Sequence, residues 1–377
     1  MSLGDGFFRA ESRPARDISV LLARYLARSL ARRPSRAGGQ RWLDLMAGCG
    51  IRALRWGLEA LPEVGAGVEL WVNDADPHRL PLLESNLAVL QPRVEALSLS
   101  AMPAEVLLAQ AFADKRFFDL IDLDAFGSPS ALIQPVLQVL AFDGVLLLAS
   151  TDGRSPTGHD RPGAIRSFGA AARAHPASWE LALRLQLGLV ARQAWMLGRG
   201  VQPLLAFSEG RTFRLAVRLT RRPTAVEEEH LGLVARCERC GDQQLQAMLR
   251  LQGWPRCHCA DGIGRWAISG PLWLGPLQDP QALAELMDPR AELATSTATL
   301  IQRLQADPGL PARVWPTDEL SRRLGMDGPP RVADLVETLR RAGHRAWPSA
   351  LMAGQVRTDA DFPELLQLCA GLRLKGL

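Results

Sequence analysis

The sequence predicts an α/β protein whose main sheet is parallel and ends in an antiparallel hairpin, followed by a smaller, mainly helical region that holds a metal ion. Three observations predict this class. Short apolar segments alternate with helical ones between residues 41 and 149, which is typical of parallel strands joined by helices. The turn at residues 208–211 is too short for a crossover, so the two segments that flank it are expected to pair as a hairpin. Two close pairs of cysteines follow, as in many zinc sites.

The individual elements follow from hydrophobic periodicity and from turn residues. The expected strands are Arg41–Met46, Val68–Val72, Val94–Leu99, Phe118–Leu123, Val145–Ala149, Gln202–Phe207 and Thr212–Leu219. The expected helices span about 17–33, a segment from Ile51, 77–90, 103–113, 130–140, 161–174 and 178–198. Five strands alternating with helices and then a closing hairpin are the order of a class I S-adenosylmethionine-dependent methyltransferase sheet, which is Rossmann-like. A nicotinamide-dependent dehydrogenase would instead continue with parallel strands.

Length and composition are those of a soluble, cytoplasmic globular protein. With 377 residues, of which 47% are hydrophobic and 22% charged, the chain can form two domains. We expect neither a membrane span nor a secretory signal, because long apolar runs are missing and charges interrupt the N-terminus. The net charge is +4, and Lys115 and Lys375 are the only lysines. An arginine-rich excess suits phosphate contacts, although a GC-rich coding bias has the same effect.

The chain is organised around the segment 118–129. Apolar residues around Asp119 and Asp122 predict a buried parallel strand. Asp124 follows at its carboxyl end, where open α/β sheets bind their ligands, and Phe126 offers an aromatic face two residues later. A carboxylate beside a ring suits a planar substrate such as a nucleobase. The alternative is an acidic turn with a core phenylalanine.

A glycine turn and an acidic residue predict a site for an adenosine-containing cofactor. Gly48 and Gly50 follow the first strand and let the backbone approach a ligand at the start of a helix. Asp74 ends the second strand, where a carboxylate can bind the two ribose hydroxyls. Asp76 is an alternative for that role, or the cap of the following helix.

Clustered cysteines predict a structural zinc site. The expected ligands are Cys237, Cys240, Cys257 and Cys259. The second pair is one residue tighter than usual, so His258 could replace one of its thiolates. Four protein ligands leave no open position for chemistry; the alternative is four incidental buried thiols. Cys49 and Cys369 are expected to be ordinary buried residues.

Two further features suit a nucleic acid but have common structural uses. Arg24, Arg28 and Arg32 recur every fourth residue and form either a phosphate-binding edge or a solvated face. The helical segments Asp318–Leu324 and Arg331–Arg341 flank a glycine- and proline-rich turn, which resembles a helix-turn-helix unit. Such pairs also serve protein packing.

Several segments together resemble the Trm1 family of tRNA (guanine-N2)-dimethyltransferases, which modify the guanosine at position 26 of tRNA. The matching segments are Phe7-Phe8, Arg16-Asp17, Gly48 to Arg52, Asn73-Asp74, Asp122 to Pro129, Thr151 to Gly153, the cysteine cluster, Gly270 to Gly275 and Val356 to Ala360. They extend over nearly the whole chain. The resemblance implies a methyltransferase domain at residues 1–222 and a zinc-containing, tRNA-binding C-terminal domain at 223–377. The polar segment 221–236 is expected to be the linker between them.

The resemblance also implies S-adenosyl-L-methionine as the methyl donor and a role for each matching residue. Asp124 is the implied catalytic carboxylate, and Phe7 and Phe126 are the implied aromatic residues that stack on the base. Glu180 lies in the implied substrate region. The implied cofactor-binding residues are Arg16, Asp44, Gly48, Gly50, Arg52, Asp74, Ser100 and Ala101. The alternatives are surface charges for Arg16 and Arg52 and an N-terminal anchor for Phe7.

A few positions depart from the family pattern. Ala125 stands where proline is usual, Ser100 where aspartate is usual, and Trp179 where a histidine precedes Glu180. The Ala125 change loosens the loop without removing a functional group. Two alternatives therefore stay open: a tRNA-binding relative without activity, and an enzyme that methylates an amine of another RNA or of DNA. The set of tRNAs, the number of methyl groups and the oligomeric state are not encoded in any motif.

Overall fold

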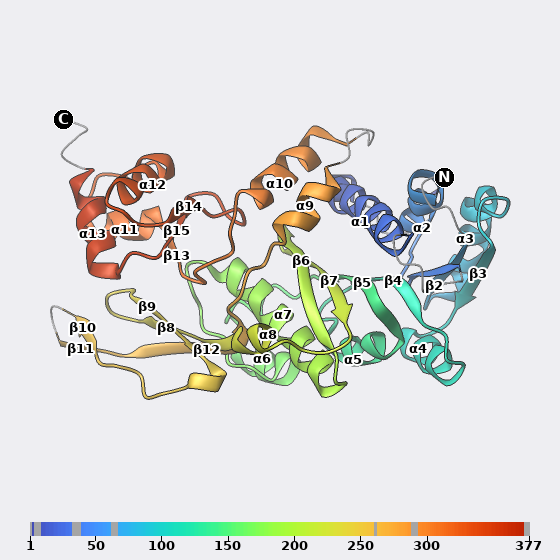
Figure 1. The fold of residues 1–377 in the computed structure, drawn as a ribbon, viewed down its shortest axis with the longest axis horizontal. Helices are drawn as coiled ribbons and strands as arrows, with labels where there is room; N and C mark the ends of the chain where they lie inside the picture. Colours follow the sequence, from blue (N-terminus) through green and yellow to red (C-terminus); the bar gives the residue numbers. More distant parts are fainter. Residues whose placement is uncertain are drawn as a thin grey trace. The chain divides into compact units, whose positions relative to one another are not determined.

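The computed structural model describes residues 2–3, 9–31, 39–61, 67–259, 262–287 and 293–372, which pack into two compact units (Figure 1). The first unit comprises residues 1–151, 190–223 and 279–302, and the second comprises 152–189, 224–278 and 303–377. The units therefore alternate along the chain, while the expected domain boundary between residues 222 and 223 stays a prediction. Among the described helices, none combines the length and the apolar character that a membrane crossing needs.

The first unit is built on a seven-stranded sheet with the order β3-β2-β1-β4-β5-β7-β6. Its strands are β1 Gln40–Asp44, β2 Val68–Asp74, β3 Ala96–Ala101, β4 Phe118–Ala125, β5 Leu140–Ser150, β6 Gly200–Glu209 and β7 Thr212–Thr220. Strands β1 to β5 pair in parallel, and β7 pairs antiparallel with both β5 and β6. The predicted Rossmann-like sheet with a closing hairpin is confirmed.

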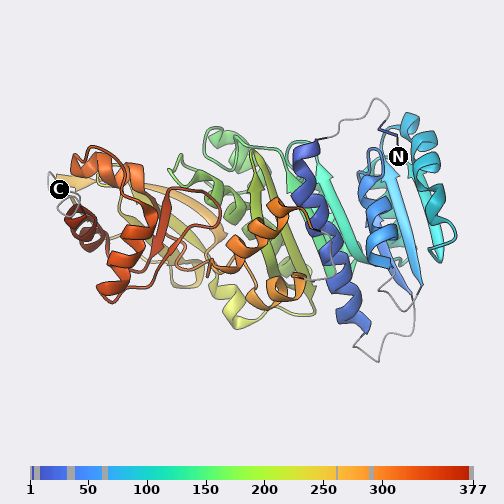
Figure 2. The same cartoon turned by 90° about the horizontal axis from the view of Figure 1, so that it is seen from above.

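Helices cover both faces of this sheet, as parallel strands buried on two sides require. They are α1 Arg13–Ala31, α2 Ile51–Arg55, α3 Leu80–Leu87, α4 Ala104–Ala113, α5 Ser130–Val139 and α9 Pro280–Leu286, with short helical turns at Ala10–Ser12, Trp56–Ala60, Pro77–Arg79 and Ala88–Leu90. Figures 1 and 2 show α1 and α2 on one face, and Figure 1 shows α4 and α5 on the other. The carboxyl ends of β1 to β4 are thus free to carry loops at one edge.

Asp17 differs from its expected place at the start of the first helix. Helix α1 begins four residues earlier, with Pro14 in its first turn, where proline is well tolerated. Asp17 is fully buried in the helix, pairs with Arg55 at 2.7 Å and accepts a hydrogen bond from Thr297 at 2.7 Å. It therefore links α1 to two other segments of the first unit.

The second unit is an α+β assembly of small antiparallel sheets and helices. Its sheets have the orders β12-β8-β9, β13-β15-β14 and β10-β11. The strands are β8 Leu231–Cys237, β9 Gln243–Ala247, β10 Cys257–Cys259, β11 Gly262–Gly264, β12 Trp266–Trp273, β13 Val314–Pro316, β14 Ala346–Pro348 and β15 Gln355–Thr358. The helices are α6 Arg161–Phe168, α8 Ala225–Glu229, α11 Thr317–Leu324, α12 Val332–Arg341 and α13 Phe362–Gly371, with a short turn at Met248–Arg250. Helices α7 Ser178–Met196 and α10 Thr295–Gln305 each run from one unit into the other.

The expected linker at residues 221–236 is wrong for most of its length. Thr224 and Glu227 form a reciprocal capping box that starts α8, and β8 is the central strand of its sheet. The charged residues Glu227 to Glu229 belong to the short helix α8. Strand β8, which follows it, pairs with β12 and β9. The expected helix at 161–174 also ends earlier, at Gly169, which adopts a left-handed conformation with φ +56°.

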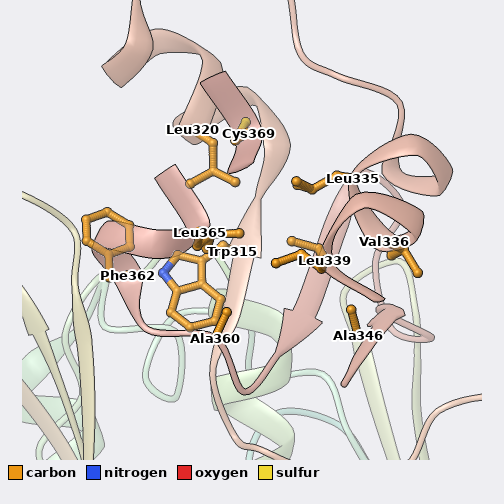
Figure 3. Packing of buried hydrophobic residues seen from close by; sticks show 11 residues of the cluster. Trp315, Leu320, Leu335, Val336, Leu339, Ala346, Ala360, Phe362, Leu365 and Cys369 are labelled. Carbon is orange, nitrogen blue, oxygen red and sulfur yellow. The ribbon is translucent and has the colours of Figure 1, made fainter. Parts of the chain in front are cut away.

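The C-terminal helices enclose an apolar core of the second unit (Figure 3). Trp315 stacks on Phe362 with ring centroids 6.4 Å apart, and Leu320, Leu339 and Cys369 complete the core. Both α11 and α12 contact α13, so the predicted helix pair serves packing in this unit. Burial of Cys49 and Cys369 confirms their interpretation as ordinary core residues.

Candidate active site

The carboxyl edge of the first unit's sheet brings together most of the predicted site residues. The loops after β1, β2, β3 and β4 meet there, because neighbouring parallel strands end side by side. Asp44 pairs with Asp122 in the ladder, and Asp74 pairs with Ala101. Residues remote in the sequence are therefore neighbours at this edge.

Asp124 is held between two arginines at the end of β4. Its Oδ2 accepts hydrogen bonds from Arg52 and, at 3.5 Å, from Arg214 of β7. The Asp124 side chain is 31% exposed, so it stays accessible from the edge. Burial alone would raise the pKa of Asp124, but the charges of Arg52 and Arg214 lower this pKa below its ordinary value. The carboxylate is consequently an oriented anion and a weak base.

Arg52 is the centre of a buried carboxylate cluster. It pairs with Asp122 at 2.5 Å as well as with Asp124. Burial would lower the pKa of Arg52, yet Asp122 and Asp124 raise it above its usual value. Burial, and then the charge of Asp122, raise the pKa of Asp44 to about 8, so that Asp44 is largely protonated near neutral pH. The implied cofactor contacts of Asp44 and Arg52 stay predictions.

Arg214 and Glu209 are functional candidates that the sequence analysis missed. Arg214 donates to Glu209 at 3.0 Å, and Glu209 accepts a hydrogen bond from the backbone N–H of Ala15 at 3.1 Å. These contacts join the start of α1, the hairpin and Asp124. The sequence held one signal for Arg214, which is a charged residue within the otherwise apolar strand Thr212–Leu219. A buried arginine needs a partner, so its position predicts a nearby carboxylate.

The glycine turn after β1 has the geometry that a bound ligand needs. Gly48 has φ +57°, and among the described residues, its two chain neighbours aside, no atom lies within 4 Å of the position that a Cβ would take. Its N–H donates to Asp74 Oδ2 at 2.8 Å. Gly50 has φ +76°, and a Cβ there would meet Leu83 at 3.0 Å. Glycine is therefore favoured at both turn positions, and the side of Gly48 is open among the described residues.

Asp74 and its neighbours form a hydrogen-bonded support for this turn. Asp74 Oδ1 accepts from the N–H of Asp76 at 3.0 Å, and Asp76 in turn caps the following helical turn through His78. The helix-cap interpretation of Asp76 is thus confirmed. Asn73, which the sequence analysis used only as a motif residue, accepts from the Ser100 hydroxyl at 2.7 Å and so joins β2 to β3.

Phe126 projects from a loop that is fixed at its base. Its side chain is 80% exposed. The next residue, Gly127, has φ +80°. Its N–H donates to the Thr151 hydroxyl at 2.7 Å, and its carbonyl oxygen accepts from the Thr151 N–H at 3.0 Å. An aromatic face is thereby presented on a rigid support close to Asp124.

Two of the implied site residues, Phe7 and Arg16, belong to the N-terminal segment. Phe7 is outside the described residues. Arg16 donates to the carbonyl oxygens of Arg9 and Ala10, at 2.9 and 3.2 Å. Burial, and then the charge of Arg52, lower the pKa of Arg16, which places the two guanidinium groups in one electrostatic neighbourhood.

Glu180 belongs to a buried ion network of the second unit. Its two oxygens pair with Arg184 at 2.8 Å and with Arg357 at 2.7 Å, and Arg357 also pairs with Asp307 at 3.1 Å. All four side chains are buried. Packing is therefore the role that the contacts of Glu180 support, and its implied role in the substrate region stays a prediction.

The four predicted cysteine ligands form a compact cluster in the second unit. Their sulfur atoms all lie within 4.8 Å of one another, as a tetrahedral metal site requires. The N–H of Cys240 donates to the sulfur of Cys237, and the N–H of Asp242 donates to that of Cys240. Backbone donors of this kind favour thiolates. The cluster can hold a metal ion of the size and charge of Zn²⁺.

Comparisons with known proteins agree with this geometry. A family model described as N2,N2-dimethylguanosine tRNA methyltransferase matches residues 4–370. The tRNA (guanine(26)-N(2))-dimethyltransferase of Thermococcus kodakarensis is 28% identical over 365 residues, which are 92% of this chain and 88% of that protein. The protein of the same name from Methanoregula boonei is 28% identical over 97% of this chain and 91% of its own.

A solved structure shares the whole fold. Trm1 from Pyrococcus horikoshii, determined as a complex with S-adenosyl-L-methionine, superimposes with a TM-score of 0.81 at 23% identity, over 98% of this chain and 96% of that one. At this identity the likeness concerns the fold. The family match extends over nearly the full length, so the chain belongs to the N2,N2-dimethylguanosine tRNA methyltransferase family, whose members are enzymes.

Proposed function

We propose that this chain transfers methyl groups from S-adenosyl-L-methionine to the 2-amino group of guanine at position 26 of tRNA, giving mono- and dimethylguanosine. The observation that carries the proposal is the Asp124 carboxylate, held by Arg52 and Arg214 at the sheet edge and close in sequence to the exposed ring of Phe126. Family membership supports the same reaction.

Asp124 would act on the amine by orientation and charge stabilisation. The lone pair of the guanine amine is delocalised into the ring, so the nitrogen is a poor nucleophile. A carboxylate that accepts a hydrogen bond from this amine holds it in line and stabilises the positive charge that develops on nitrogen. Because the pKa of Asp124 is lowered, we assign it this electrostatic role rather than that of a strong general base.

The glycine turn would hold the methyl donor. The open side of Gly48 admits a ligand to the backbone. Asp74 keeps lone pairs for ribose hydroxyls, since each of its oxygens accepts one hydrogen bond within the described part of the chain. The residues of this edge therefore fit an adenosine-containing cofactor. When bound, S-adenosyl-L-methionine supplies a methyl group that its sulfonium already activates.

Phe126 would receive the target base after it leaves the helical stack. Unstacking costs a few kcal/mol, and stacking on an aromatic ring offsets part of that cost. The exposed ring on its fixed loop suits this task, and Phe7 is proposed as the second stacking residue.

We also propose that the four cysteines hold structural Zn²⁺ and that the enzyme works in the cytoplasm. Metal analysis of the purified chain should find one zinc per molecule, and Cys237→Ser should lose it. Cys49→Ser is the matched control, because Cys49 is a buried thiol outside the cluster. Wild-type protein purified without zinc, yet fully folded, would contradict the assignment.

Nucleoside analysis tests the function. Unmodified tRNA is incubated with the full chain and labelled S-adenosyl-L-methionine, digested and separated. We expect labelled mono- and dimethylguanosine, and no label in a tRNA with adenosine at position 26. Cofactor binding by calorimetry without any product would favour the non-catalytic alternative, and label in the position-26 variant would favour another target amine.

A further inference from the structure

The second unit contains a depression that the proposed methyl transfer does not use. Its volume is about 360 Å³, and it is lined by Pro176, Arg236, Glu319, Arg322 and Arg323. Arg236 comes from β8, next to the cysteine cluster, and the other charged residues come from α11. Spacings of three and four place the three α11 residues on one face of that helix.

Positive charge exceeds negative charge in this depression. A single carboxylate oxygen, Oε1 of Glu319, accepts hydrogen bonds from both Arg236 and Arg323, the latter at 2.7 Å. Arg322 is 73% exposed and pairs only at the surface, with Asp318 at 3.3 Å. His175 adds no charge near neutral pH, because burial, and then Arg236, lower its pKa to about 4. The lining thus contains three guanidinium groups and one carboxylate, Glu319, which pairs with Arg236 and Arg323.

Contacts with the rest of the second unit hold Arg236 and Arg323 in place. Arg323 donates to the backbone carbonyl of Arg239, within the turn between the first two cysteines, at 2.8 Å. Arg236 belongs to the central strand of its sheet, and its Nε is buried with no hydrogen-bond partner among the residues that the structure describes. A buried donor without a partner is costly, and a bound oxygen ligand would satisfy it.

We propose that this arginine depression, formed by Arg236, Arg322 and Arg323, binds a backbone phosphate of the tRNA. The inference rests on the proposed function for the identity of the nucleic acid. Guanidinium groups bind phosphate oxygens through paired N–H donors, and phosphate contacts supply most of the affinity of proteins for nucleic acids. Such contacts position the RNA without reading its sequence.

Arg322→Ala tests the site, because Arg322 is exposed and its loss leaves the Glu319 contacts in place. The full chain is titrated with tRNA at several salt concentrations, with fluorescence anisotropy as the readout. We expect several-fold weaker binding and a slope of log K against log salt that is smaller by about 0.7 to 0.9, the value for one phosphate. Arg322→Lys should restore most of the slope.

Arg341→Ala is the matched control. Arg341 forms the same type of i,i+4 surface pair, with Glu337, on α12, and its side chain is 61% exposed. Equal losses of tRNA affinity in the two alanine variants would overturn the site, and so would an unchanged salt slope in Arg322→Ala. The site would also be overturned if polyglutamate competed for the protein as well as RNA does. The readout is binding, so a wild type that binds tRNA but methylates nothing would sink the proposed function and leave this site standing. Melting temperatures within about 1 °C of wild type would exclude a folding defect.

Discussion

At the residue scale, Asp124 works through its partners. Arg52 and Arg214 both contact one of its oxygens, and each has a second carboxylate, Asp122 or Glu209, on its other side. These alternating charges hold the Asp124 carboxylate in place, and each arginine keeps a second carboxylate as a partner. Both of these arginine bonds go to Oδ2, so Oδ1 of Asp124 is the oxygen that we propose for the substrate amine.

Asp124→Ala should reduce methyl transfer by at least about 10² to 10³ while leaving the fold intact. The two arginines keep Asp122 and Glu209 as partners, so neither is left as an unpaired buried charge. Loss of a group that stabilises developing charge typically costs about 10² to 10³ in kcat. Single-turnover kinetics on tRNA and calorimetry with S-adenosyl-L-methionine measure the two effects. Asp114→Ala, at an exposed ion pair with Arg116, is the control. If Asp124→Ala turned over as fast as wild type, Asp124 would have no part in the mechanism.

Asp44 should make the free energy of unfolding depend on pH. Its folded-state pKa is raised to about 8 by burial and then by Asp122, whereas an aspartate in an unfolded chain titrates near about 4. Between these values the unfolded chain releases a proton that the folded chain keeps, so Asp44 lowers stability as pH rises. The isosteric Asp44→Asn lacks this titration and should gain stability over wild type from about pH 4 to about pH 8. Urea denaturation at several pH values measures the difference; parallel curves would contradict it.

At the element scale, the candidate site residues of the first sheet lie at the carboxyl ends of its strands and not in their middle. The β1 to β5 ladder is a generic scaffold, and the candidate residues Asp44, Asp74 and Asp124 stand at or next to the last residue of a strand, at its carboxyl edge. Positive φ angles at Gly48, Gly50 and Gly127 let these loops turn sharply.

Gly48→Ala should weaken cofactor binding more than it weakens the fold. A left-handed alanine costs about 1 kcal/mol, but no atom of the described residues blocks the new methyl group. That methyl would occupy the side proposed for the cofactor. Gly210→Ala is matched, because Gly210 has φ +56° and equally open surroundings in the β6–β7 turn. We expect similar melting temperatures for both and a raised Kd for S-adenosyl-L-methionine in Gly48→Ala alone; equal Kd values would exclude the proposed contact.

At the scale of the whole molecule, the chain crosses between its two units several times, so each unit is assembled from distant segments. In the second unit, the buried network of Glu180, Arg184, Asp307 and Arg357 joins two of these segments, 152–189 and 303–377. A network of this kind specifies which segments meet, although its net contribution to stability is smaller than its contact energies.

Glu180→Gln should destabilise the second unit by about 3 to 5 kcal/mol, because it leaves two buried arginines short of a counter-charge. Denaturant unfolding measures this loss. Glu337→Gln, at an exposed pair, should change stability by less than about 0.5 kcal/mol. A stable Glu180→Gln variant with impaired turnover would instead support the implied role of Glu180 toward the substrate.

Much of the architecture was predictable from the sequence because it is encoded locally. Apolar periodicity and short turns specify strands and helices, and the hairpin turn specifies antiparallel pairing, so the order of the first sheet follows. Asp124, Phe126 and the cysteine pairs were recognisable because each motif is contiguous. The segment 221–236 was misread for a local reason as well, since its charges resemble those of a linker while its capping box and strand are short.

The sequence by itself thus determined the sheet, the candidate residues at its carboxyl edge and the cysteine cluster. Only the tertiary structure decided which charges meet: Arg214 lies 90 residues from Asp124, and Arg357 lies 177 residues from Glu180. No local pattern contains such pairings, because a buried ion pair forms only where packing brings two distant segments together and excludes water. The arginine depression was not predictable from the sequence either, because its residues come from a strand and a helix more than 80 positions apart.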